Sequence, residues 1–112
     1  MWLTSFDLDP GWGPIEAKLV RQASIGQRTD WAWVVLEPSI RIRGESHSQV
    51  LLGARHQGDS VWSEPGRWPI HVYVCVPEQG DVTQNGFAPD QVSIAYWGLL
   101  HQSRERAQVD KF

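Results

Sequence analysis

The pattern of side chains is most legible in the stretch from Trp68 to Pro77, which is largely apolar on both faces if extended. This stretch is rich in β-branched and aromatic residues, which favour strands. Because successive side chains of a strand point to opposite faces, one face would carry four aliphatic residues, Ile70, Val72, Val74 and Val76. The other face would carry His71, Tyr73 and Cys75. The pattern predicts a central strand that is covered on at least one side.

Short apolar or alternating runs on both sides of this stretch predict further strands, at residues 2–8, 31–37, 40–43, 48–55, 60–63 and 91–98. Pro38 is expected to end the strand at 31–37 before the next one begins at residue 40, because proline cannot donate a hydrogen bond to a β-ladder. In the last strand, Val92, Ile94 and Tyr96 would share one side.

Residues 15–25 fit either a strand or a helix, since Pro14 would suit the start of a helix and Gly26 its end. The strand is favoured, because the polar segment 26–30 then connects it to the next strand as a hairpin. The helix stays open as the main structural alternative.

Short strands separated by turn signals about every ten residues are typical of an all-β fold. We predict an antiparallel β-sandwich or partly open β-barrel of about seven or eight short strands. The chain of 112 residues suits one domain, 1–112, with a polar tail at 101–112 that is frayed or a short helix.

The chain has neither the features of a signal peptide nor an apolar run near the ~20 residues of a membrane helix. Its lone cysteine, Cys75, cannot form an internal disulfide. We therefore expect a soluble, cytoplasmic protein with a buried and inert thiol. The formal net charge of -3 argues against nonspecific nucleic-acid binding, which needs concentrated Lys and Arg.

Familiar signatures of catalysis are missing from the sequence. It has no nucleophile elbow, no phosphate-binding glycine loop and no pair of carboxylates that stands out. Its histidines lack the close paired spacing of a zinc site, so we expect no metal and no other cofactor. A noncatalytic protein is favoured over an enzyme, and no residue is assigned a catalytic role.

The densest group of polar side chains lies between Arg55 and Trp62, where a guanidinium, an imidazole and a carboxylate stand close to a glycine. Loops of this kind on a rigid β scaffold often bind ligands or partners. The alternative is an ordinary hairpin loop in which Asp59 caps backbone amides. Two loop tryptophans, Trp62 and Trp68, would form an apolar patch if exposed, or would close the ends of the sheet if buried.

These residues predict a binding module that engages a protein partner, such as an immunity-like or adaptor-like protein. Trp62 and Trp68 would anchor the partner, and three polar residues would give specificity, Arg55, His56 and Asp59.

A second hypothesis is a small-molecule site or minor enzyme at a barrel mouth, which would use His71 and Tyr73 with the same loop. A third is a homodimer formed through a sheet edge. The segment 97–100, Trp-Gly-Leu-Leu, is similar to a strand end in some immunity proteins of bacterial toxin systems, but four residues assign no family.

Overall fold

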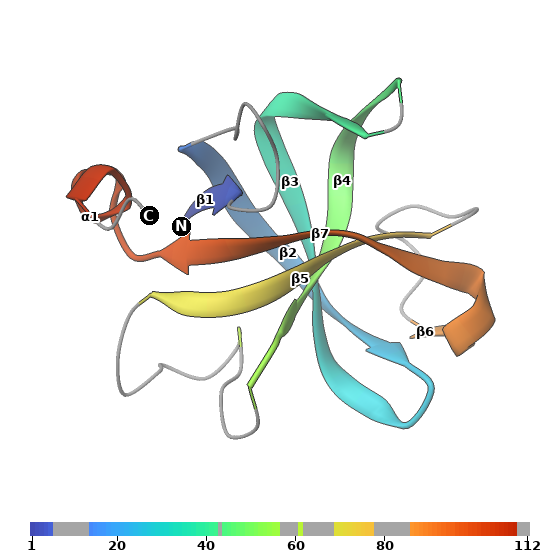
Figure 1. The fold of residues 1–112 in the computed structure, drawn as a ribbon. Coiled ribbons are helices and arrows are strands. Elements are labelled where there is room, and N and C mark those ends of the chain that lie inside the picture. The colour runs from blue at the N-terminus through green and yellow to red at the C-terminus, as the bar shows by residue number, and fades with distance from the viewer. Residues whose placement is uncertain (6–13, 43, 57–60, 62–68, 78–85, 110–112) are drawn as a thin grey trace.

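The computed structural model describes residues 1–5, 14–42, 44–56, 61, 69–77 and 86–109. Within these ranges seven strands form one sheet (Figure 1). The strands are β1 (Trp2–Ser5), β2 (Ile15–Ile25), β3 (Arg28–Ile42), β4 (Glu45–Ala54), β5 (Ile70–Pro77), β6 (Gly86–Phe87) and β7 (Val92–His101). The predicted all-β class is confirmed.

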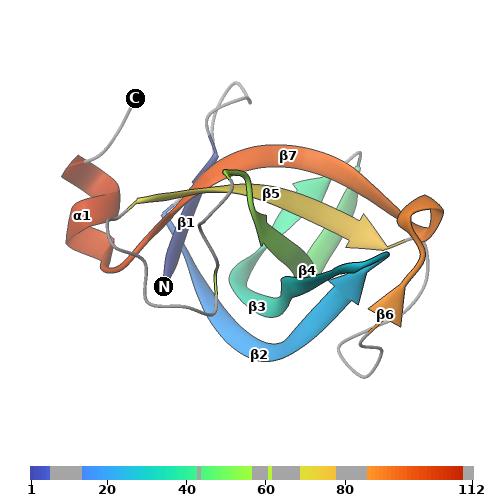
Figure 2. The same cartoon turned by 90° about the horizontal axis from the view of Figure 1, so that it is seen from below.

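Six of these strands close into a ring of hydrogen-bonded neighbours, in the order β1-β7-β5-β4-β3-β2, because β1 also pairs with β2 (Figure 2). All pairs within the ring are antiparallel, and the ring has the form of a small barrel. β6 lies outside it and pairs in parallel with the end of β2, where a wholly antiparallel sheet was predicted. The antiparallel prediction is therefore wrong for the β2–β6 pair and holds for the six strands of the ring.

Two short helices flank β7 in the described part of the chain. A 3-10 helix, η1 (Pro89–Gln91), precedes it, and α1 (Arg104–Val109) follows it and contacts β1 and β7. α1 confirms the short-helix alternative for the polar tail. None of the described helices combines the length and the apolar character needed to cross a membrane.

The favoured strand over residues 15–25 is confirmed, and Gly26 makes the turn into β3 with a φ of 61°. The predicted break at Pro38 is wrong, since β3 runs through it from Arg28 to Ile42. The register of β3 against β4 shifts between Val35 and Ile40, so Pro38 lies in an irregular stretch. A residue that cannot donate to the ladder is compatible with such a place.

The predicted faces of β5 are confirmed, with Ile70, Val72 and Val74 buried on the interior side of the ring. In β7 the prediction is wrong, because Tyr96 packs against the interior cluster whereas Val92 packs against a second cluster. A register shift between β5 and β7 reverses the alternation there: Tyr96 pairs with Val74, but Ile94 pairs with the next residue, Cys75.

All six strands of the ring contribute buried aliphatic side chains to its interior. The largest of these with essentially no exposure include Leu3, Val34, Val50, Leu52, Ile70, Val72, Val74 and Leu100. Fully burying one side chain of this kind contributes about 1.5–3 kcal/mol, so the interior is the main stabilising feature of the fold.

The joint between β1 and β7 depends on a close approach of two backbones. A Cβ atom placed on Gly98 would overlap the carbonyl oxygen of Thr4. Between the same two strands, the side chains of Thr4 and His101 form a buried hydrogen bond, 3.0 Å between Oγ1 and Nε2. Glycine at position 98 therefore permits β1 to close the ring.

Replacing Gly98 with Ala is expected to lower the free energy of unfolding by about 1–3 kcal/mol, because a backbone atom cannot rotate away as a side chain can. Gly86→Ala is the matched control, since among the described residues its Cβ would meet the Ser24 hydroxyl, at an ordinary contact distance of 3.4 Å. Urea titrations followed by tryptophan fluorescence measure both changes. Equal stability of Gly98→Ala and the parent protein would contradict this account of ring closure.

Candidate functional site

A second hydrophobic cluster covers the outer face of the ring. It is separated from the interior by the alternation of side chains along β3, β4 and β5. Its buried members are Ala23, Trp31, Trp33, Leu51, Cys75 and Phe87. Phe87 of β6 meets Trp33 edge-on, with 5.8 Å between ring centroids. The two tryptophans of β3, Trp31 and Trp33, thus lie outside the barrel and are nevertheless buried.

A row of aromatic side chains crosses this outer face. The register aligns Gly53 of β4 with Tyr73 of β5, and Tyr73 with Trp97 of β7. A Cβ on Gly53 would lie 2.7 Å from the Trp31 ring, so this ring occupies the space above the glycine. Trp31 stacks on Tyr73 at 6.5 Å, and Tyr73 meets Trp97 edge-on at 6.4 Å.

Arg55 extends this row at the end of β4. Its backbone N–H donates to the carbonyl of His71 at 2.7 Å, which continues the pairing with β5. Its guanidinium carbon lies 4.0 Å from the ring centroid of Trp97 and 6.0 Å from that of Tyr73. Beside it, the His56 ring meets the His71 ring edge-on at 5.0 Å. We call five residues the arginine–aromatic surface: Arg55, His56, His71, Tyr73 and Trp97.

The arginine–aromatic surface is accessible at its β7 edge. Trp97 is 39% exposed, and Ile94, two register positions along the same outer face, is 51% exposed. Four large apolar side chains are exposed among the described residues, and two of them, Ile94 and Trp97, lie on this outer face. Adjoining exposed apolar and cationic groups are typical of interfaces.

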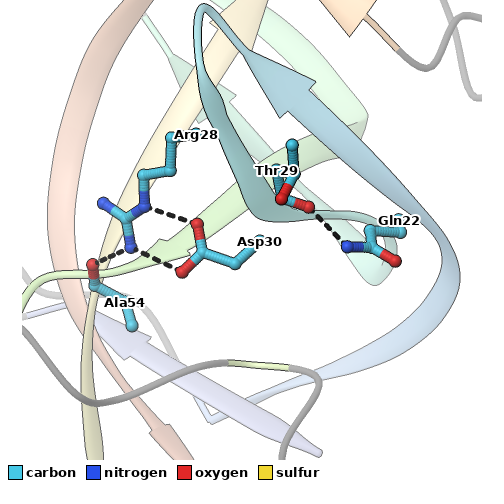
Figure 3. A network of polar contacts seen from close by, with 5 residues as sticks. All are labelled: Gln22, Arg28, Thr29, Asp30 and Ala54. Atoms are coloured by element: carbon cyan, nitrogen blue, oxygen red, sulfur yellow. Dashed lines mark hydrogen bonds and ion pairs between the residues drawn. The ribbon is translucent and has the colours of Figure 1, made fainter.

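A second arginine, Arg28, lies at the opposite end of the aromatic row. Its guanidinium is 5.2 Å from the Trp31 ring centroid. Figure 3 shows that it also forms two hydrogen bonds with the carboxylate of Asp30 and one with the carbonyl of Ala54. Arg28 is therefore neutralised within the fold and holds the β2–β3 hairpin against the end of β4.

Four of the seven predicted binding residues come together in the arginine–aromatic surface: Arg55, His56, His71 and Tyr73. The other three lie outside the described residues, namely Asp59, Trp62 and Trp68. Sequence reasoning missed Trp97. Consecutive strands are commonly neighbours in a sheet, so pairing the predicted strands 68–77 and 91–98 would have placed Trp97 near Tyr73.

A pocket of about 220 Å³ lies elsewhere, where the β3–β4 hairpin meets the β5 and β7 ends. It is lined by Ile42, Glu45, His47, Val76, Pro77, Ser93 and Ala95. His71 and Tyr73, the residues of the second hypothesis, do not line this pocket, and Tyr73 packs against the outer cluster. Side-chain alternation, which buries Val72 inside, turns both of them outward.

The described residues contain no group of three or more His, Cys, Asp or Glu side chains placed to hold a metal ion. Comparison with models of known protein families, with curated proteins and with solved structures finds no match to this chain. The residues of the site are therefore the basis for the function proposed below.

Cys75 lies under the aromatic row and is buried. Burial raises the pKa of its thiol from 9.0 to about 12, and the positive charge of Arg28 opposes this shift weakly. The folded protein therefore keeps the thiol protonated at a pH where the unfolded chain releases its proton. The resulting contribution to stability is complete below pH 9 and is lost as the pH rises towards 12.

Replacing Cys75 with Ala should remove this pH dependence. Between pH 9 and 11 the stability advantage of the parent protein over Cys75→Ala is expected to shrink by on the order of 1 kcal/mol per pH unit. Urea titrations of both proteins at pH 8, 9, 10 and 11 measure the difference. A difference that stays constant over this range would show that the thiol ionises equally in the folded and unfolded states.

Proposed function

We propose that the protein is a noncatalytic binding module that engages a protein partner through the arginine–aromatic surface. The observation that carries the proposal is the stacking of Arg55 on Trp97, beside Tyr73, on an accessible outer face. Trp, Tyr and Arg are the residue types that most often dominate the binding energy of protein interfaces.

The scaffold supports this role because each contributing side chain is held by the sheet. Tyr73 is fixed between Trp31 and Trp97, and the backbone of Arg55 is bonded to β5. A preorganised surface loses less conformational entropy on binding than a mobile one. Partner recognition then needs no rearrangement of the strands.

Trp97→Ala should leave a folded protein whose affinity for its partner falls about tenfold or more, as expected for a central aromatic anchor. The matched control is Val20→Ala on β2, because Val20 is 46% exposed and does not belong to the surface. Tagged parent, Trp97→Ala and Val20→Ala proteins are used to capture partners from the native cell. Purified partners are then titrated by calorimetry.

We expect the partner captured by the parent protein to be lost with Trp97→Ala and retained with Val20→Ala. Retention by both variants, with circular dichroism showing that both are folded, would place the binding surface elsewhere.

A second candidate function, binding of a small molecule, is favoured by the pocket at the end of the barrel. Its walls are mainly aliphatic, and its polar groups include Glu45 and His47, with 3.7 Å between Oε2 and Nε2. Ligand pockets usually measure about 300–1,000 Å³, so this one suits a small ligand with an apolar body and one hydrogen-bonding head.

Ala95→Leu should fill this pocket and abolish fragment binding, whereas Ala88→Leu, at an exposed position outside the pocket, should not. A fragment library screened by protein-observed NMR tests this, with the shifts mapped onto Val76 and Ala95. Fragments that bind Ala95→Leu as well as the parent protein would exclude the pocket as their site.

A further inference from the structure

Two arginines lie on the same aromatic row, and their electrostatic surroundings differ. Arg28 is paired with Asp30 through two hydrogen bonds. Within the described part of the chain, ion pairs join Arg28 to Asp30 and His47 to Glu45, and Arg55 takes part in neither. Among the described residues, the side chain of Arg55 lies against the rings of Trp97 and Tyr73.

Stacking leaves the hydrogen-bonding edge of a guanidinium available. The guanidinium carbon of Arg55 lies over the Trp97 ring, and the N–H donors of a guanidinium point outward in its own plane. These donors match the two oxygens of a carboxylate, and the planar fork favours paired hydrogen bonds to it. The neighbouring His56 ring adds further hydrogen-bonding capacity and no negative charge.

We infer that the partner of the arginine–aromatic surface is an acidic protein segment, one of whose carboxylates binds Arg55 while an adjacent apolar group packs on Trp97. This inference rests on the proposed function and adds the chemistry of the partner. The supporting observation is charge complementarity: the surface presents a cation that the described part of the fold leaves without a counter-charge, beside an apolar platform.

Single-stranded nucleic acid is the other polymer that combines negative charge with groups that stack on aromatic rings. Its binding relies on a track of several basic residues along the phosphate backbone. Here the second arginine of the row is already neutralised by Asp30, and the net charge of the chain is -3. An acidic protein segment is therefore favoured.

The test uses the full chain and three short synthetic probes: the capped peptides hexaglutamate and hexaglutamine, and the oligonucleotide (dT)6. Binding is followed by NMR through the indole N–H of Trp97 and the side-chain Nε–H of Arg55. Hexaglutamate should shift both signals in a saturable manner, more weakly at 300 mM than at 50 mM NaCl because salt screens the charges. Hexaglutamine should leave both signals unchanged.

Two arginine variants provide the matched comparison. Arg55→Gln should weaken hexaglutamate binding about tenfold, and Arg55→Lys should weaken it less, because the charge is kept and the planar fork is lost. Arg104→Gln is the control, since Arg104 also lies over a tryptophan, 5.7 Å from the ring centroid of Trp2. It should bind hexaglutamate as the parent protein does. Urea midpoints verify that all three variants are folded.

Equal binding of hexaglutamate and hexaglutamine, equal binding by Arg55→Gln and the parent, or tighter binding of (dT)6 would each overturn the inference. The proposed function is tested separately by the Trp97→Ala capture experiment. If Trp97→Ala loses its partner while Arg55→Gln keeps it, the acidic partner is excluded and the binding surface stands. If both variants keep the partner, both proposals fail.

Discussion

Closure of the ring around an aliphatic interior is the constraint on which the rest of this structure depends. Six strands supply the side chains that fill the ring, and β1 joins its two ends by pairing with both β2 and β7. The joint needs the close approach of Gly98 to the Thr4 backbone. Once the ring is closed, the alternation of each strand decides which side chains face outward.

The outer face carries large aromatic residues because the alternation along β3 and β5 turns their side chains outward. Trp33 is fully buried outside the ring, under Phe87 of β6, and Trp31 occupies the space that Gly53 leaves open. Burial of these rings gives a rigid support on which Tyr73 and Trp97 are held. The accessible end of the row, where Arg55 stacks on Trp97, is thus continuous with a second hydrophobic core.

The alternation of residues in the sequence correctly predicted which side chains face inward where a strand has no bulge. In β5 the aliphatic set including Val72 and Val74 lies inside and Cys75 lies outside, as the sequence predicts. The pattern failed at irregularities, which have no clear signal in the sequence. β3 continues through Pro38 with a shifted register, and the shift between β5 and β7 moves Tyr96 to the interior. A bulge of this kind depends on the partner strand, so one strand alone cannot reveal it.

By itself, the sequence determined the all-β class and the two faces of β5. It also indicated four candidate binding residues that lie together in the structure: Arg55, His56, His71 and Tyr73. Only the tertiary structure decided that Trp97 lies against Tyr73 and under Arg55. It also decided that Asp30 neutralises Arg28, whereas no carboxylate among the described residues pairs with Arg55. The physical reason is that alternation is a property of one strand. Register, by contrast, results from the packing of whole strands against one another.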